Sequence, residues 1–202
     1  MELREVLRKR RMVRAFRPDP VEPEVVQRLL AAAHRAPSAG FSQGYALLVL
    51  QGADQLDPFW QIMAAGDGDY YDSPAGRGLR NAPLLIVPLS CKDIYLDRYA
   101  RPDKGWTDRD EAHWPVPYWD IDTGFTALLM LLTAVDEGLG ALFFGIPPEL
   151  FGRFRAQYGV PDGYTPIGAV AVGRPDPAAD QGGSSKVIRR RGLDEIAHHG
   201  RW

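Results

Sequence analysis

The sequence predicts a layered domain that mixes helices and strands, of the α+β or α/β class. Four short apolar runs are typical of strands, at residues 46–50, 83–89, 141–144 and 167–172. They are interspersed with helical patterns, and the second run is apolar without a break, as expected for a sheet covered on both faces. The chain has 202 residues, 45% of them hydrophobic and 25% charged. We therefore expect a single domain, 1–202, with a substantial core.

Three amphipathic helices are predicted around these strands, at residues 2–11, 24–35 and 149–158. The second has apolar residues at helical spacing, and Pro23 suits its first turn. The expected inward faces are Leu3, Val6 and Leu7 in the first helix, Val25, Val26, Leu29, Leu30 and Ala33 in the second, and Leu150, Phe151 and Phe154 in the third.

Residues 124–135 predict a helix that is apolar nearly all the way round and therefore buried on all sides. It is too short to cross a bilayer, and a second subunit over one face would make its burial easier. Gly138 is expected to end it. Asp120 and Asp122 precede it, and we interpret them as caps of its N-terminus rather than as a catalytic pair.

Two stretches have no clear periodicity. Residues 66–78 are rich in Gly and Asp and are expected to form a mobile surface excursion. Residues 93–120 combine aromatic residues, prolines and charges. They are interpreted either as a lid over a binding site or as a surface loop whose aromatic side chains pack among themselves.

The charge is distributed unevenly. Residues 1–17 hold seven Lys/Arg against two Glu, a net charge of +5, and residues 186–202 hold five Lys/Arg against two acids, a net charge of +3. Because the whole chain has a net charge of −2, the residues between these ends carry a net charge of −10. Long basic arms that bind nucleic acid usually contain few apolar residues. Apolar residues are interleaved at both ends here, which favours a small anionic ligand over nucleic acid.

Other classes are disfavoured by what the sequence lacks. The lone Cys91 excludes an intramolecular disulfide, and the histidines, including the adjacent His198 and His199, lack metal-ligand spacing. Residues 1–17 lack the apolar segment of a signal peptide, and no apolar run is long enough for a membrane span. A cytoplasmic protein without a metal site is the expectation.

A basic stretch near the start, Arg10-Arg11-Met12-Val13-Arg14-Ala15-Phe16, is the first candidate binding element. Arginine presents a planar fork of donors that matches phosphate oxygens, although a solvated helix face is the plainer interpretation of this stretch alone. The small residues of 36–45 allow a ligand to approach the backbone closely. No nucleophile elbow, P-loop or Rossmann glycine motif is present. A bound cofactor would then have to carry any reaction.

These features together resemble the nitroreductase family. The resemblance spans the chain in order and rests on the stretch 10–16, on Leu29-Leu30-Ala31-Ala32-Ala33 leading to Ala36-Pro37-Ser38, on Gly138-Leu139-Gly140, on Gly173-Arg174-Pro175 and on residues 189–196. It implies a three-layer α+β fold with a central, mostly antiparallel sheet flanked by helices. It also implies an intertwined homodimer, with FMN held between the subunits and NAD(P)H as co-substrate.

The resemblance also implies site residues. The cofactor contacts would be Arg10, Arg11, Met12 and Arg14; Pro37, Ser38, Ala39, Phe41 and Gln43, in a loop contributed by the partner subunit; Phe143, Phe144 and Gly145; and Arg189 and Arg191. Residues 176–202 would form an extension that completes the FMN site, and a backbone N–H near Gly145 would meet the flavin N5. Independently of the resemblance, we expect Phe41 to bring a large apolar ring towards the cleft, and Trp114, Tyr118 and Trp119 of a lid to stack on a planar substrate. The chain departs from the family pattern at Met12, where a serine is common, and at Phe41, which replaces an asparagine.

The function implied is an FMN-dependent oxidoreductase. It would pass hydride from NAD(P)H through flavin N5 to nitroaromatic, quinone or related conjugated acceptors in a ping-pong reaction. A flavin-binding protein used for storage or sensing, with little turnover, is the alternative. NADH and NADPH remain open as donors, as do FMN and a deazaflavin as cofactors.

Overall fold

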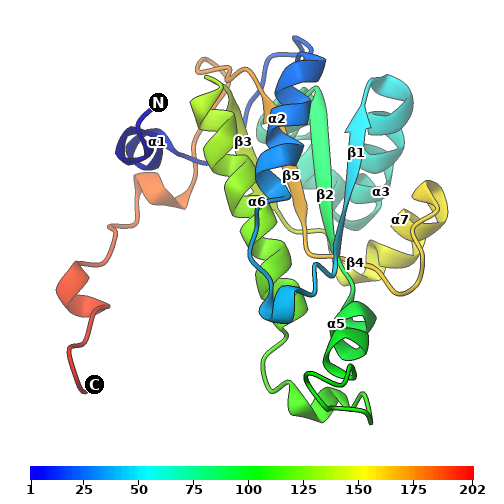
Figure 1. The fold of residues 1–202 in the computed structure, drawn as a ribbon. Helices are drawn as coiled ribbons and strands as arrows, with labels where there is room; N and C mark the ends of the chain where they lie inside the picture. The colour runs from blue at the N-terminus through cyan, green and yellow to red at the C-terminus, as the bar shows by residue number, and fades with distance from the viewer.

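The computed structural model describes residues 1–202, arranged around one central sheet (Figure 1). The sheet contains β1 (Tyr45–Gln51), β2 (Leu84–Ser90), β5 (Ala169–Gly173) and β3 (Gly140–Phe144) in that order, and the short β4 (Thr165–Pro166) also pairs with β2. All of these pairings are antiparallel. The four predicted strands and the antiparallel sheet are thereby confirmed.

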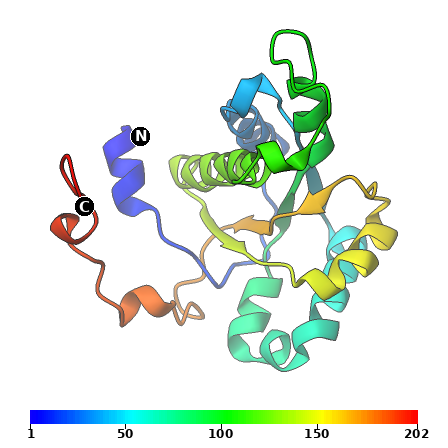
Figure 2. The same cartoon turned by 90° about the horizontal axis from the view of Figure 1, so that it is seen from below.

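Helices cover both faces of the sheet, which gives the predicted three layers (Figures 1 and 2). One face is covered by α2 (Pro23–Ala33) and α6 (Tyr118–Asp136), and the other by α3 (Ala53–Asp72), α4 (Pro74–Arg80) and α7 (Phe151–Tyr158). The remaining elements are α1 (Leu3–Lys9), α5 (Lys92–Tyr99) and the 3-10 turns η1 (Ala39–Phe41), η2 (Glu111–His113), η3 (Pro148–Leu150), η4 (Ser184–Lys186) and η5 (Leu193–Glu195).

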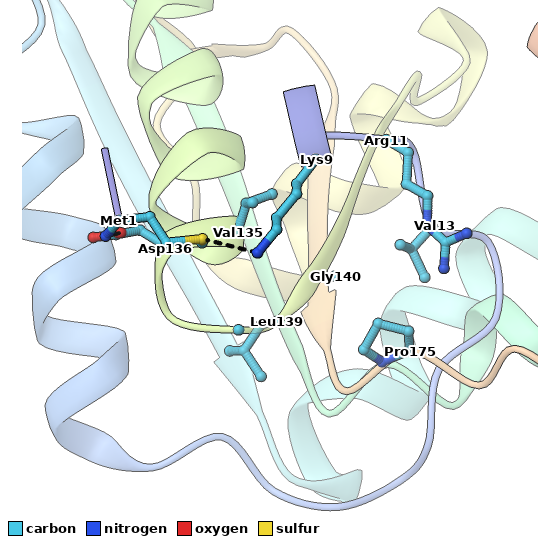
Figure 3. Close-up of a pocket in the computed structure, with 10 residues that line it drawn as sticks. Met1, Lys9, Arg11, Val13, Val135, Asp136, Leu139, Gly140 and Pro175 are labelled. Atoms are coloured by element: carbon cyan, nitrogen blue, oxygen red, sulfur yellow. Dashed lines mark hydrogen bonds and ion pairs between the residues drawn. The ribbon is translucent and has the colours of Figure 1, made fainter. Parts of the chain in front are cut away.

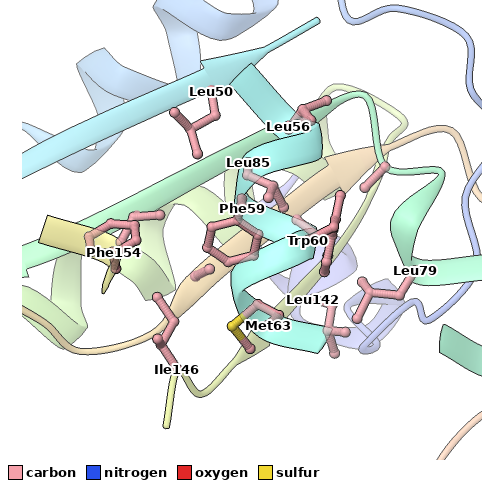
Figure 4. Packing of buried hydrophobic residues seen from close by; sticks show 14 of the residues in the cluster. Leu50, Leu56, Phe59, Trp60, Met63, Leu79, Leu85, Leu142, Ile146 and Phe154 are labelled. Carbon is pink, nitrogen blue, oxygen red and sulfur yellow. The ribbon is translucent and has the colours of Figure 1, made fainter. Parts of the chain in front are cut away.

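The central strands contribute to two separate cores because successive side chains of a strand point to opposite faces. In β2, Leu85 and Val87 pack towards α3 and α7, whereas Leu84 and Ile86 pack towards α2 and α6. Figure 4 shows the first core, in which Phe59 of α3 lies among side chains of the sheet and Phe154 of α7. This double burial explains why β2 is apolar at every position.

The segment 53–80 is helical, so the prediction of a mobile surface excursion at 66–78 is wrong. Leu56, Phe59, Trp60 and Met63 recur at helical spacing and are all at least nine-tenths buried. The glycines at 66 and 68 suggest a loop, but this apolar face keeps the segment on the sheet as α3. Between the two glycines the helix has only a kink, at Asp67 (φ −145°, ψ 66°).

The irregular stretch 93–120 is also more ordered than predicted. Its first part is α5, and its last residues begin α6 at Tyr118, six residues before the helix expected at 124. Asp120 and Asp122 therefore lie inside α6 and do not cap it: Asp120 accepts a hydrogen bond from the Ser90 hydroxyl at 2.6 Å.

α6 is not buried on all sides within one chain. Ile121, Phe125 and Leu128 are 39%, 39% and 47% exposed and follow one another at i, i+4 and i+7, so they form a single apolar stripe. The opposite side of the helix, including Met130 and Ala134, is fully buried against the sheet. None of the helices combines the length and apolar character needed to cross a membrane.

Both termini project from the layered body on the same side (Figure 2). Of the expected inward face of α1, only Val6 is buried, while Leu3 and Leu7 are 63% and 55% exposed. Beyond β5 the chain continues as an extended arm, 176–202, whose apolar side chains are also solvent-exposed: Val187, Ile188, Leu193, Ile196 and Trp202. These segments present apolar surface that a single chain does not cover.

Candidate functional site

The basic stretch lies at the edge of the sheet, in an extended conformation that follows α1. The Val13 N–H donates to the Ala141 carbonyl at 3.0 Å, and the Phe16 N–H donates to the Gly78 carbonyl at 3.0 Å. Val13, Ala15 and Phe16 are buried. Burial of these three residues and the hydrogen bonds to β3 and α4 hold the segment against the body and fix where its arginines emerge.

The arginines emerge on different sides of this segment. Arg14 lines a cavity of about 330 Å³ together with Phe143, Phe144 and Gly145 at the end of β3. Arg11 instead faces a second hollow, shown in Figure 3, beside Lys9 of α1 and the turn Gly138–Gly140 after α6. The sequence grouped the arginines as one cluster because of their spacing, but in an extended chain adjacent side chains point in opposite directions.

Arg14 is a cation without a carboxylate partner. Its guanidinium donates only to the Met12 carbonyl, at 3.2 Å, and Arg14, Arg10 and Arg11 take part in no ion pair. Arg17 on the same segment pairs with Asp19 at 3.0 Å. A half-buried guanidinium whose remaining donors are free is suited to bind an anionic oxygen.

The Met12 side chain points inward. It is partly buried and packs against both cores of the sheet. The thioether therefore fills core space at the point where the family pattern has a serine, and it supplies packing instead of a hydroxyl contact.

Aromatic side chains form one wall of the Arg14 cavity. Phe144 stacks on Trp60 with a centroid distance of 5.9 Å and an interplanar angle of 11°, and Trp60 contacts Tyr71 at 5.8 Å. Burial, and to a lesser extent the neighbouring Tyr70 and Asp67, raise the pKa of Tyr71 to about 12. The aromatic side chains of this wall are therefore uncharged at neutral pH. The Asp67 side chain also lines the cavity, and its carboxylate accepts a hydrogen bond from the Tyr70 N–H at 3.2 Å.

Asp67, Tyr70 and Tyr71 line the same cavity as Arg14, and the sequence reasoning missed them. The glycines and aspartates around them suggest a loop. The detectable signal was the apolar periodicity of 56–63, which predicts a helix that delivers the following residues to the sheet edge.

The loop 36–45 is folded back on itself beside α5. The Gln43 N–H donates to the Ser38 hydroxyl at 2.9 Å, and the Ser42 hydroxyl donates to the Ala39 carbonyl at 2.6 Å. Phe41 (φ 55°) and Gln43 (φ 53°) have left-handed backbone conformations, and the Phe41 ring is 74% exposed. Pro37 is exposed as well. This loop does not line the Arg14 cavity of its own chain.

The aromatic residues of 93–120 pack mainly on one another. Trp114 and Trp119 are 9% and 8% exposed and form a small core with Tyr95 and Leu96. Tyr118 is 43% exposed, with its ring 5.8 Å from that of Trp114. The structure thus favours the second of the two interpretations, a segment whose aromatic side chains pack among themselves. Of the three predicted substrate contacts, only Tyr118 is well exposed.

Arg189 and Arg191 lie on the C-terminal arm. Arg189 pairs with Glu195 at 2.8 Å, and Arg191 pairs with the same carboxylate at 3.6 Å. Both side chains are well exposed. Neither side chain lines the Arg14 cavity.

The structure thus defines a class of protein: a three-layer α+β fold with a cavity that places an unpaired arginine beside a backbone turn at the end of a strand. A family model for the nitroreductase family matches residues 7–174. The chain belongs to the nitroreductase family.

Relatives and solved structures agree with this assignment. An NADPH-dependent oxidoreductase of Staphylococcus aureus (strain MRSA252) is 25% identical over 201 residues, which cover 98% of this chain and 72% of the relative. A nitroreductase family protein from Clostridium difficile 630 has a TM-score of 0.70 at 24% identity and covers both chains completely. An FMN-dependent nitroreductase from Clostridium difficile R20291 has a TM-score of 0.68 at 21% identity over 98% of each chain. At these identities the two structures establish the fold.

Proposed function

We propose that this protein is an FMN-dependent oxidoreductase that takes its reducing equivalents from NADPH and reduces nitroaromatic, quinone or related conjugated acceptors. The observation that carries the proposal is the cavity that joins the unpaired Arg14 to the backbone at Phe143–Gly145. The NADPH dependence of the staphylococcal relative favours NADPH over NADH as the donor.

The residues around the cavity fit FMN. Arg14 offers free donors for a phosphate or ribityl oxygen, and the aromatic side chains of Phe144 and Tyr71 in the cavity wall suit a flat aromatic ring. A side chain built onto Gly145 would meet no atom within 4 Å, so a ring can lie directly against the backbone there. We assign Arg14, Tyr71 and the turn Phe143–Gly145 as the residues that would hold the cofactor. Arg11 faces the other hollow and is left out of this assignment.

When bound, FMN would supply the hydride chemistry that no side chain of this cavity has. The chain's own residues would bind and orient. Arg14 would neutralise an anionic oxygen, Phe144 and Tyr71 would keep water from one side of the ring, and the Gly145 N–H would donate to an acceptor atom on its edge.

A dimer would complete this site. The Phe41 loop does not reach the cavity of its own chain, and the stripe on α6, the outer face of α1 and the arm 176–202 leave apolar side chains exposed. We propose that a second copy covers these surfaces, brings its residues 37–43 to the flavin, and lets Arg189 and Arg191 of the arm approach the phosphate. Tyr118 and the partner's Phe41 would then be the side chains that face the acceptor.

The test is the cofactor itself. The purified protein should show a flavin spectrum, release FMN on denaturation as identified by mass, and bleach rapidly on anaerobic mixing with NADPH. A colourless protein that stays colourless after incubation with FMN would sink the proposal. A flavin that NADPH does not bleach would indicate storage or sensing instead.

Arg14→Ala tests the anion contact. Because a hydrogen bond to a charged group contributes about 1.5–3 kcal/mol, the variant should bind FMN roughly 10- to 100-fold more weakly. Arg17→Ala is the matched control: the same residue type on the same segment, already paired with Asp19. It should bind FMN as the wild type does. Equal losses in the two variants would refute the assignment, and the measurement is fluorescence titration of apoprotein with FMN.

A further inference from the structure

Asp122 is a buried carboxylate to which the proposed function assigns no role. It is 3% exposed, on the side of α6 that faces α5, yet neither an arginine nor a lysine pairs with it. Its Oδ2 accepts two hydrogen bonds, from the Tyr95 hydroxyl at 2.7 Å and from the Ala39 N–H at 2.8 Å. A buried charge is tolerated only where such donors replace water. The second donor belongs to the loop that carries Phe41.

Tyr95, the other side chain in this contact, is also buried. It is completely buried on α5, and burial, together with the hydrogen bond to Asp122, raises the pKa of its hydroxyl. The hydroxyl therefore stays protonated and remains a donor throughout the neutral range. Asp122 and Tyr95 thus join α6, α5 and the loop at one point.

Further contacts fix the same loop on α5. The Arg98 Nε donates to the Gly40 carbonyl at 2.9 Å. A Cβ at Gly40 would lie 2.7 Å from the Tyr99 ring, and one at Gly44 would lie 2.5 Å from the Tyr95 ring. Only glycine permits this close approach of the backbone. The loop is held at both of its ends.

Between these anchors, Phe41 adopts an unfavourable arrangement. A left-handed backbone costs a bulky residue on the order of 1–3 kcal/mol, and a ring that is 74% exposed recovers little of this by burial. Such strain persists only where surrounding contacts fix the backbone, and it is typically found at functional sites.

We infer that Asp122 is a positioning residue: its hydrogen bond to the Ala39 N–H holds the loop in the strained conformation that presents Phe41 to the acceptor, and Phe41 determines acceptor specificity. This inference rests on the proposed function, because the loop faces a flavin only in the proposed dimer. Asp122 itself does not contact the acceptor.

Three variants separate positioning from folding. Asp122→Ala removes the acceptor of the Ala39 hydrogen bond, whereas Asp122→Asn keeps a carboxamide oxygen in its place. Asp120→Ala is the matched control, because Asp120 lies one half-turn away on α6 and accepts from Ser90 instead of the loop. The holoenzyme of each is assayed for acceptor KM, for the rate of flavin bleaching by NADPH, and for amide hydrogen exchange of residues 38–43.

In Asp122→Ala we expect faster exchange at Ala39 and an acceptor KM raised about tenfold, the effect of one lost hydrogen bond to a charged group, with a much smaller change in the bleaching rate. Asp122→Asn should restore both values to within about twofold. Asp120→Ala should leave both at the wild-type level. In a Phe41→Ala background, Asp122→Ala should raise KM no further, because the two residues act through the same ring.

Unchanged exchange at Ala39 in Asp122→Ala would overturn the inference, and so would an equal KM increase in Asp120→Ala or additive effects with Phe41→Ala. If the wild-type protein takes up no flavin, the proposed function fails and the specificity claim fails with it. The exchange comparison would still decide whether Asp122 anchors the loop.

Discussion

The apolar stripe on α6 gives the sharpest test of the proposed dimer. Complete burial of an aliphatic or aromatic side chain contributes about 1.5–3 kcal/mol. Ile121, Phe125 and Leu128 are 39%, 39% and 47% exposed, so covering what remains of each contributes about 1 kcal/mol. Three side chains on two copies then stabilise the dimer by roughly 6 kcal/mol, before α1 and the arm are counted.

Leu128→Glu should separate the subunits. It removes two of these contributions and places an unpaired carboxylate at two equivalent buried positions, each costing several kcal/mol. The dimer dissociation constant should rise more than about 10⁴-fold. Light scattering after size exclusion at micromolar concentration should then give the monomer mass of 22.4 kDa for the variant and twice that mass for the wild type. Flavin content should fall in parallel, because the loop of the partner would leave the site.

Gln61→Glu is the control for this experiment. Gln61 is exposed on α3, on the opposite face of the sheet, and the change adds the same charge. A Leu128→Glu protein that remains a dimer, or a wild-type monomer that carries a full complement of flavin, would refute the reasoning.

Two further predictions concern the aromatic residues. Because the pKa of Tyr71 is raised by burial from 10.0 to about 12, its stabilising contribution is complete below pH 10 and is lost as the pH rises towards 12. Denaturant titrations across this range should show a fall in unfolding free energy that Tyr71→Phe reduces by on the order of 2 kcal/mol; an unaltered slope would show that the phenol is solvated. Trp119→Ala, which empties part of the Trp114 and Tyr95 cluster, should cost about 3–5 kcal/mol of stability and leave the acceptor KM unchanged. A raised KM at wild-type stability would restore the lid interpretation of 93–120.

The sequence by itself determined the layers of this protein. Hydrophobic periodicity is a local property, so the uninterrupted apolar run of β2 predicts a strand buried on both faces, and the period of α2 predicts a helix and the face that it buries. The same reasoning failed at 66–78, where glycine and aspartate indicate a loop. That segment packs against residues that are distant in the sequence, since Gly66 lies beside Leu150 and Gly78 beside Ala15, and no local pattern contains these contacts.

The tertiary structure decided which charged residues work together. Arg11 and Arg14 are near neighbours in sequence, but the extended backbone sends them to different cavities. Asp122 and Ala39 are 83 positions apart, and a hydrogen bond of 2.8 Å joins them. The sequence predicted Asp122 as a helix cap because its neighbours along the chain suggested one. Its actual partners are brought to it by the packing of α5 on α6. The strength of a hydrogen bond depends on the distance between the two groups in space and on their exclusion from water. Neither is set by how far apart the residues lie along the chain.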